Sequence, residues 1–265
     1  MARLFVIGGA AGPCVLGRFV SLSGGPAADI VVIATASRSP STVEAEHVAL
    51  FRELGAGTVR ALRLSTRAEA NAVDPQALES ATGVYFTGGD QLRITTVLGG
   101  TQTDSLLQRL VHQGQIVLAG TSAGAAMMSG TMIVGGDGPG ISAASVRTGP
   151  GLEFLPGVLI DMHFAERGRL NRLLSAVALY PHELGLGIDE DTAILADGDV
   201  FEVLGSGSVT IVDAGAATDI RVPADGPIAF AGARIHVLPA GCRFELSGRR
   251  PSIVDGAAGE RGQAA

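Results

Sequence analysis

One stretch of small and apolar residues constrains the fold of the whole chain. Residues 115–119 form a short apolar run, and the sequence GTSAG follows at 120–124, before further small and helix-favouring residues. This order predicts a buried strand, a sharp turn and a helix. Glycines on both sides of Ser122 would let neighbouring backbone approach a serine held in a strained conformation. The pattern is typical of a nucleophile elbow, although it also occurs in ordinary strand-to-helix turns.

Apolar runs and helical patterns alternate along the first two thirds of the chain. Strands are expected at residues 4–7, 29–36, 58–64, 83–86, 115–119, 157–161 and 185–188. Such continuous apolar runs predict an α/β fold, with a mostly parallel sheet covered by helices on both faces. Residues 131–150 are rich in glycine and serine without a clear period, so we expect a long loop there. From residue 193 onward, short apolar runs between Gly, Asp and Pro predict antiparallel strands that extend the sheet.

Length and composition favour one globular domain. The chain has 265 residues, 46% of them hydrophobic, and we expect a single α/β domain over 1–251. Residues 193–251 would be its β-rich extension, and the polar Gly/Ala-rich residues 252–265 are expected to be a disordered tail. A net charge of −7 argues against general binding to nucleic acid or anionic membranes.

Cysteine content and the N-terminal sequence bear on the compartment. Cys14 and Cys242 are too few for a disulfide framework and lack the spacing of metal ligands. The first residues do not resemble a secretory signal, and no apolar run reaches the roughly 18 residues that cross a bilayer. We therefore expect a cytoplasmic protein without a bound metal.

Polar clusters follow four of the predicted strands, where functional groups of α/β sheets collect. They are Gly88-Gly89-Asp90-Gln91, Ser122, Asp161-Met162-His163 and Asp189-Glu190-Asp191-Thr192. A nucleophilic serine needs a base, an acceptor that orients the base, and donors for the oxyanion. Among five histidines only His163 ends an apolar strand, so it is the candidate base. The spacing does not decide which of the three acidic residues 189–191 orients the base. The backbone N–H groups of Gly89 and Ala123 are the candidate donors of the oxyanion hole.

Arginines gather just after the candidate base. Arg169 and Arg172 share one helix face, and Arg167 precedes Gly168 in the loop before it. Guanidinium groups bind carboxylates through two parallel hydrogen bonds, so this group suits recognition of an anionic substrate. Solvated arginines or internal salt bridges are the alternative interpretation.

Four ordered motifs resemble the cyanophycinase family, which is related to peptidase E. They are FTGGDQLRI at 86–94, GTSAGA at 120–125, DxHFxxRxRxxR at 161–172 and GIDEDTA at 187–193. The resemblance implies a flavodoxin-like scaffold similar to class I glutamine amidotransferases, and a homodimer. It also implies that Ser122 is the nucleophile, His163 the base and Glu190 its orienting acid, without metal or cofactor. The substrate site would be lined by Gln91, Asp161, Arg167, Arg169 and Arg172.

The resemblance also implies a substrate and leaves alternatives. The family cleaves cyanophycin, a poly-aspartate with arginine on each side-chain carboxyl, into β-Asp-Arg dipeptides, and Asp161 would bind the substrate guanidinium. Met162 departs from the family, which usually has glutamine there, so a thioether replaces a hydrogen-bonding amide. A dipeptidase or isoaspartyl peptidase for other acidic or β-aspartyl peptides is one alternative. A non-catalytic binding module on the same scaffold is another.

Overall fold

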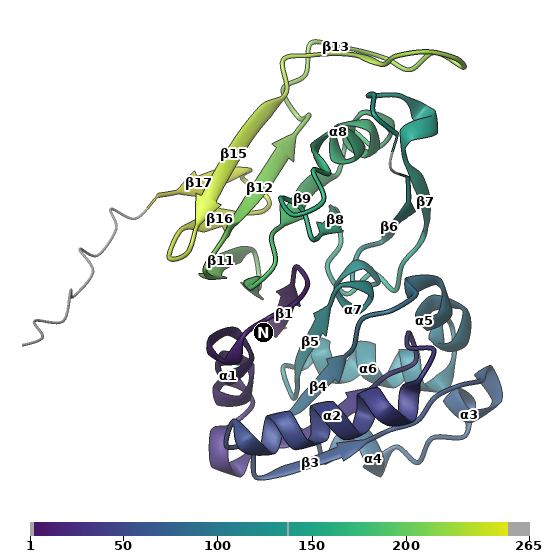
Figure 1. Cartoon of the computed structure of the whole chain (residues 1–265), viewed down its shortest axis with the longest axis vertical. Helices are drawn as coiled ribbons and strands as arrows, with labels where there is room; N and C mark the ends of the chain where they lie inside the picture. The colour runs from purple at the N-terminus through teal and green to yellow at the C-terminus, as the bar shows by residue number, and fades with distance from the viewer. Residues whose placement is uncertain (1–2, 137, 254–265) are drawn as a thin grey trace, which may run out of the picture.

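The computed structural model describes residues 3–136 and 138–253, and most of its strands lie in two sheets (Figure 1). The large sheet contains, in spatial order, β17 (Arg250–Ser252), β16 (Arg243–Glu245), β11 (Val200–Gly205), β10 (Thr192–Asp197), β1 (Arg3–Ile7), β5 (Val117–Thr121), β4 (Gly83–Phe86), β2 (Asp29–Ile33) and β3 (Thr58–Ala61). The second sheet contains β15 (Arg234–Pro239), β12 (Ser208–Asp213), β9 (Leu184–Ile188) and β8 (Val158–Met162).

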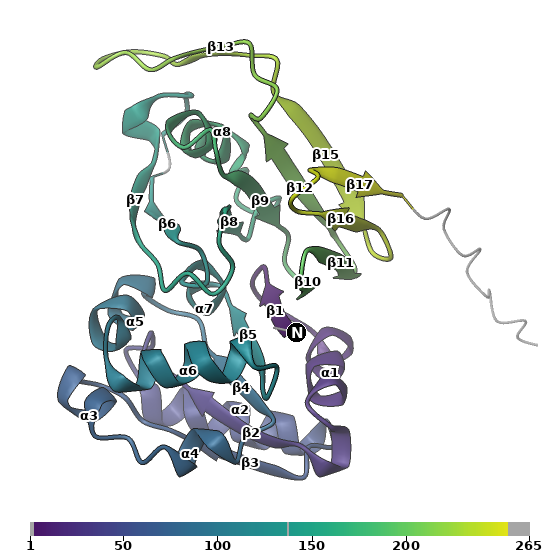
Figure 2. The same ribbon diagram turned by 180° about the vertical axis from the view of Figure 1, so that it is seen from behind.

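The parallel half of the large sheet carries helices on both faces. Its strands β1, β5, β4, β2 and β3 pair in parallel. Side chains of β1 alternate, so that Phe5 and Ile7 pack under α1 (Pro13–Leu22) and α2 (Pro40–Glu53). Leu4 and Val6 face the opposite layer. That layer, seen in Figure 2, comprises α4 (Gln76–Glu79), α5 (Gln91–Leu98), α6 (Gln102–His112) and α7 (Ala123–Ala126), with α3 (Arg67–Asn71) packed on α5 and α6.

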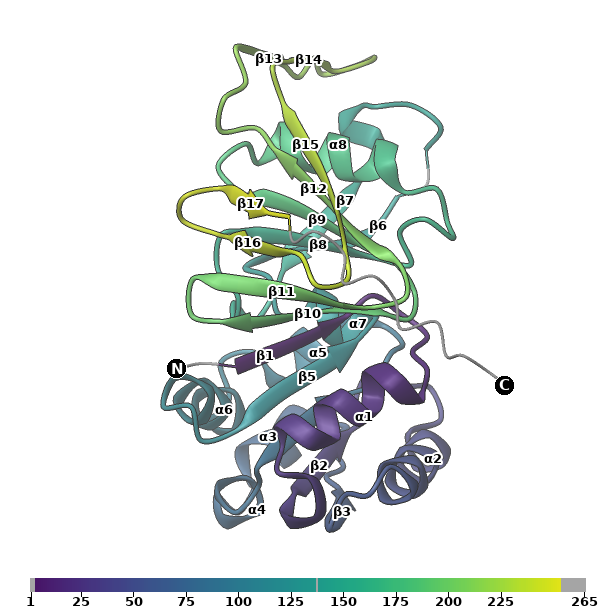
Figure 3. The same cartoon turned by 90° about the vertical axis from the view of Figure 1, so that its left-hand side faces the viewer.

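Antiparallel strands extend the large sheet beyond β1, as expected for the region after residue 193. Strand β10 pairs antiparallel with β1, and β11, β16 and β17 follow one another outward (Figure 3). Strand β10 is mostly buried, whereas β11 buries only Phe201 and Val203, which alternate along the strand. The expected α/β class, with a mostly parallel core and C-terminal antiparallel strands, is therefore confirmed.

Strands β8 and β9 do not join the large sheet. They pair in parallel with each other, and β12 and β15 continue their sheet in antiparallel orientation. Helix α8 (Leu170–Leu179) covers one face of this second sheet through Leu173 and Val177, which pack against Leu159 and Val212. The backbone N–H of His163 donates to the carbonyl of Gly8 over 2.6 Å, so the end of β8 meets the end of β1. The two sheets thus approach each other at the strand ends.

The expected long loop at residues 131–150 is wrong in part, because it contains a β-hairpin. Strands β6 (Thr131–Gly135) and β7 (Arg147–Pro150) pair antiparallel with an irregularity near Gly135. Met132 and Ile133 of β6 are fully buried, and their apolar side chains anchor this strand to the core. Two short 3-10 turns, η1 (Gly25–Ala27) and η2 (Ala143–Ser145), and a second hairpin of β13 (Asp219–Arg221) and β14 (Ala229–Ala231) complete the fold.

The predicted C-terminal tail is tested only at its start. Ser252 ends β17, so it belongs to the sheet edge, and residues 254–265 lie outside the described residues. None of the helices in the described ranges is long and apolar enough to cross a membrane. Cys14 is exposed and Cys242 is buried, and both are free.

Candidate active site

Ser122 occupies a strained turn between β5 and α7. Its backbone angles, φ 52° and ψ −110°, lie in a region that residues with a side chain rarely adopt. A Cβ added at Gly120 would lie 2.2 Å from the carbonyl oxygen of Gly124, and one at Gly124 would lie 2.4 Å from that of Phe86. The two glycines therefore permit backbone contacts that hold the turn, and the serine projects from the end of β5 as in a nucleophile elbow.

His163 follows β8 and faces Ser122. Its Nε2 lies 3.0 Å from the Oγ of Ser122, within hydrogen-bond distance. His163 also has a positive φ of 51°, which the hydrogen bond from its N–H to Gly8 supports. Gly9 leaves the space that the imidazole occupies, since a Cβ there would lie 2.4 Å from Nδ1. The ring is thus confined by the turn after β1, and its side chain is 13% exposed.

Glu190 is the acidic residue that contacts the imidazole. Its Oε1 lies 2.6 Å from His163 Nδ1, which fixes the tautomer with the proton on Nδ1 when Glu190 is ionised. Asp189 instead accepts hydrogen bonds from the N–H groups of Ala165 and Ser208. The chain of contacts from Ser122 through His163 to Glu190 leaves Nε2 free to accept a proton from the serine.

Two backbone N–H groups beside Ser122 are available as donors. Neither Gly89 nor Ala123 donates its N–H to another residue within 3–136 or 138–253. Gly89 has a φ of 141°, and Gly88 approaches Ser122 so closely that a Cβ there would lie 3.3 Å from its Cβ. Ala123 opens α7 directly after the serine. Such N–H pairs stabilise an oxyanion when they face the reacting carbonyl.

A cavity of about 310 Å³ opens in front of the serine. Its wall is formed by Gly89, Gln91, Ser122, Val134, Gly135, Gly136, Arg147, Met162, His163, Arg167, Arg169 and Arg172. This set includes four of the five residues expected to bind substrate, and it omits Asp161. The described wall contains four arginines and no acidic side chain. It therefore suits an anionic group of the substrate.

Asp161 lies behind the wall rather than in it. Its side chain is fully buried, and both carboxylate oxygens accept hydrogen bonds from Arg172, one of them over 2.9 Å. Arg169 approaches the same carboxylate to 3.6 Å. Burial raises the pKa of Asp161, and the guanidinium groups of Arg172 and Arg169 oppose that shift. This placement differs from the expected contact with a substrate guanidinium, because the carboxylate orients two arginines instead.

The remaining predicted residues line the cavity from different elements. Gln91, at the start of α5, donates through Nε2 to the carbonyl of Ile133 over 2.8 Å. Arg167 is exposed, and its guanidinium has no acidic partner among the described residues. Met162 is 5% exposed and reaches the wall at the end of β8.

Sequence reasoning missed one charged residue of the wall. Arg147 lies on β7, inside the segment that was expected to be a loop. An isolated arginine in a Gly/Ser-rich stretch gives no signal of its own. Pairing of β6 with β7 brings it to the cavity.

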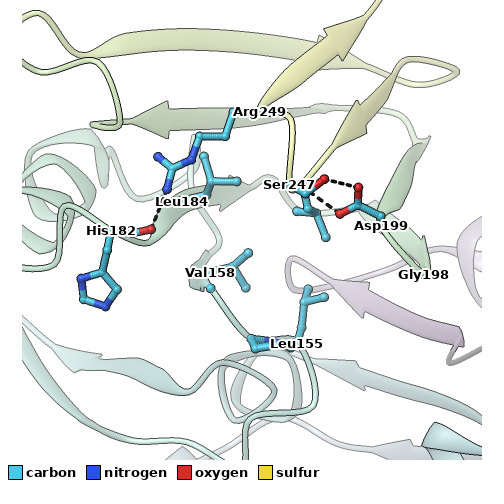
Figure 4. Close-up of a pocket in the computed structure, with 11 residues that line it drawn as sticks. Leu155, Val158, His182, Leu184, Gly198, Asp199, Ser247 and Arg249 are labelled. Carbon is cyan, nitrogen blue, oxygen red and sulfur yellow. Dashed lines mark hydrogen bonds between the residues drawn. The ribbon is translucent and has the colours of Figure 1, made fainter.

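A second cavity, of about 380 Å³, lies away from these residues (Figure 4). Its polar groups pair with one another, since Ser247 donates to Asp199 and Arg249 donates to the carbonyl of His182. The imidazole of His182 points away from Ser247 and Asp199, so the described residues of this cavity form no comparable reactive constellation. The described residues also contain no cluster of three or more His, Cys, Asp or Glu side chains that could hold a metal ion.

Fold and sequence together place the chain among the serine peptidases. The pattern of peptidase family S51 matches residues 4–204, so the chain belongs to that family.

Relatives of known name support this assignment. The chain is 41% identical over 255 residues to the cyanophycinase of Trichormus variabilis, covering 92% of this chain and 85% of the relative. It is 39% identical to the cyanophycinase of Geminocystis herdmanii, covering 94% and 96%. A peptidase from an acI-B1 actinobacterium has a similar fold, with a TM-score of 0.67 at 23% identity over 92% and 97% of the two chains.

Proposed function

We propose that this peptidase hydrolyses cyanophycin to β-Asp-Arg dipeptides, with Ser122, His163 and Glu190 as its catalytic triad. The hydrogen-bonded chain from Ser122 through His163 to Glu190 carries the catalytic part of this proposal. The names of the relatives support the substrate. Because the chain belongs to a family of serine peptidases, a non-catalytic binding module is the weaker alternative.

Acylation begins at the elbow. Ser122 Oγ attacks an α-peptide carbonyl carbon of the aspartate backbone as its proton passes to His163 Nε2. The carbonyl π electrons move to the oxygen, and the N–H groups of Gly89 and Ala123 stabilise the resulting oxyanion. Glu190 stabilises the imidazolium through Nδ1. The C–N bond then breaks, His163 protonates the leaving nitrogen, and an ester to Ser122 remains.

Deacylation repeats the same steps with water. His163 takes one proton from the water as its oxygen attacks the ester carbonyl. Collapse of the second tetrahedral intermediate breaks the bond to Ser122 Oγ, which regains a proton from His163. The products are a carboxylic acid and the free triad, and no redox step is involved.

Recognition would depend on carboxylates. In the substrate each arginine is joined to a side-chain carboxyl of aspartate, so each arginine keeps a free α-carboxylate. Arg167 and Arg169 line the cavity and can bind such groups through paired hydrogen bonds. The buried pair of Asp161 and Arg172 would hold this arrangement in place.

The alternative substrate class is a smaller acidic or β-aspartyl peptide. Met162 favours it, because a buried thioether in the wall cannot hydrogen-bond to a guanidinium as an amide oxygen can. The lack of an acidic side chain in the described wall points the same way. An enzyme of this alternative class would use the same triad.

The test is to incubate the purified protein with insoluble cyanophycin and identify the soluble products by mass spectrometry. The parent should release β-Asp-Arg dipeptides, while Ser122→Ala should release none. Ser21→Ala, which changes an exposed serine of α1, is the matched control and should behave like the parent. A serine-directed inhibitor should label the parent and the control at Ser122.

Two results would contradict parts of the proposal. If the inhibitor labels Ser122 but the protein releases nothing from cyanophycin, Ser122 is still supported as the nucleophile and cyanophycin is excluded as the substrate. Dipeptide release by Ser122→Ala would exclude Ser122 as the nucleophile. The cytoplasmic location and the homodimer stay predictions.

A further inference from the structure

Arg147 reaches the cavity because its neighbour across the hairpin is a glycine. In the register of β6 and β7, Arg147 lies opposite Gly135. A Cβ added at Gly135 would lie 2.6 Å from Nη2 of Arg147, so the guanidinium rests against the backbone of β6. Any larger residue at 135 would occupy that space. Arg147 is exposed, and its guanidinium lies in the space that the missing side chain of Gly135 leaves.

The hairpin that carries Arg147 is tied to the site from two sides. Gln91 Nε2 donates to the carbonyl of Ile133 over 2.8 Å. Arg172 Nη1 donates to the carbonyl of Gly136 over 3.2 Å. Both donors belong to the cavity wall, and their acceptors flank Gly135 in the sequence. Residues of the cavity wall thus hold β6, the strand with which the strand of Arg147 pairs.

Two arginines of the cavity wall have no acidic partner among the described residues. Arg147 and Arg167 both line the cavity, and neither has an acidic partner in the part of the chain that the structure describes. Two guanidinium groups that share a small cavity repel each other, and a carboxylate between them would replace that repulsion with attraction. The planar fork of each group can form two hydrogen bonds to one carboxylate.

We propose that Arg147 is a specificity-determining residue that binds a substrate carboxylate together with Arg167. This inference deepens the proposed function and rests on it. In the proposed substrate that carboxylate is the free α-carboxylate of an arginine in a β-Asp-Arg unit. A substrate in which this group is an amide gains nothing from Arg147.

Binding can be measured without turnover in the Ser122→Ala background. The probes are β-Asp-Arg dipeptide and its arginine α-carboxamide, titrated by isothermal calorimetry. Adding Arg147→Gln should weaken binding of the dipeptide by about 10- to 100-fold, as expected for loss of charged hydrogen bonds. Binding of the carboxamide should stay unchanged. Arg147→Lys, which keeps the charge and loses the fork, should give an intermediate affinity.

Two controls separate recognition from folding. Gly135→Ala should displace the guanidinium and weaken dipeptide binding while Arg147 itself is intact. Arg221→Gln removes an exposed arginine of β13 that pairs with Asp219, and it should change neither affinity. Thermal unfolding of each variant shows whether the fold is retained.

The inference is overturned if Arg147→Gln weakens both probes equally, leaves both unchanged, or if the dipeptide does not bind at all. Its failure is distinguishable from that of the proposed function, because cleavage of cyanophycin by the otherwise unchanged protein is measured separately. If Arg147→Gln weakens only the dipeptide but the unchanged protein does not cleave cyanophycin, Arg147 still binds a carboxylate and cyanophycin is excluded as the substrate.

Discussion

Three consecutive acidic residues after β9 have three different surroundings. Glu190 contacts the imidazole of His163 over 2.6 Å. Asp189 accepts the N–H groups of Ala165 and Ser208, and Asp191 accepts that of Gly12 over 2.7 Å. Asp189 and Asp191 therefore satisfy loop backbone, whereas Glu190 has one oxygen directed at the base. The three residues all carry carboxylates, and only the position of Glu190 relative to His163 gives it a different role.

Replacing Glu190 by Gln should remove catalysis while retaining the fold. The amide can donate to Nδ1, which places the imidazole proton on Nε2, where it cannot accept the proton of Ser122. Loss of the orienting carboxylate in such triads lowers kcat by roughly 10⁴-fold. The measurement is kcat on a β-Asp-Arg oligomer, with circular dichroism to verify folding.

Glu166→Gln is the matched control for that variant. Glu166 is exposed and accepts the N–H of Glu190 through Oε1, a contact that glutamine can keep. Its kcat should change little. Equal activity of Glu190→Gln and the parent would assign the orienting role to another group.

Sequence reasoning located the residues that follow strongly apolar strands. Ser122 and His163 were predicted from this signal, and their side chains lie 3.0 Å apart. The surroundings of Asp161 were not predictable, because its burial depends on α8 bringing Arg172 back against β8. The role of Arg147 was not predictable either, because the pairing of β6 with β7 brings it to the site and no local sequence pattern indicates that pairing.

The elbow shows how single glycines hold an element in place. Gly124, in α7, lies so close to β4 that an added Cβ would be 2.4 Å from the carbonyl oxygen of Phe86. Because that contact is with backbone, a side-chain rotation cannot relieve it. The approach of α7 to β4 also holds Ser122 in its strained conformation.

Gly124→Ala should therefore lower the free energy of unfolding. Inserting a methyl group into close-packed surroundings typically costs about 1–3 kcal/mol. Gly17→Ala in α1 is the matched control, since an added Cβ there has no neighbour within 4 Å. That control should raise stability by up to about 1 kcal/mol, because alanine is the better helix former. Urea unfolding measures both, and two changes of the same sign would contradict the packing argument.

Elements were predictable in proportion to their apolar content. Strands such as β2 and β5 are almost entirely buried, and their runs of Val, Ile and Leu are evident in the sequence. Strands β6 and β7 are short and partly exposed, and glycines interrupt their pattern. Separation of β8 and β9 into a second sheet could not be predicted, because parallel strands of either sheet have the same composition.

At the scale of the whole molecule, the site needs both sheets. Ser122 follows a strand of the large sheet, while His163 and Glu190 follow strands of the second. One cluster of buried apolar residues spans the two, since it includes Val6 and Leu118 as well as Ile160 and Leu186. We therefore expect the sheets to unfold together, and the single domain over 1–251 stays a prediction.

The surroundings of Glu183 predict that the stability of the folded chain depends on pH. It precedes β9, its side chain is 9% exposed, and its Oε1 accepts a hydrogen bond from Thr131 of β6 over 3.0 Å. The other oxygen, Oε2, has no partner among the described residues. Burial raises the pKa of Glu183 and Glu153 adds to this, whereas Thr131 and His182 oppose the shift. The folded protein therefore binds the proton more tightly than the unfolded chain.

A carboxyl whose pKa is raised by folding contributes stability below its unfolded pKa and loses that contribution as pH rises through its folded pKa. Glu183→Gln should accordingly be more stable than the parent near neutral pH, because the amide avoids burying a charge and can still accept from Thr131. The difference should shrink in acid, below the ordinary carboxyl pKa of 4.5. Urea unfolding at several pH values measures it, with exposed Glu46→Gln as the control. A difference that grows toward acid would show that folding lowers the pKa of Glu183 instead.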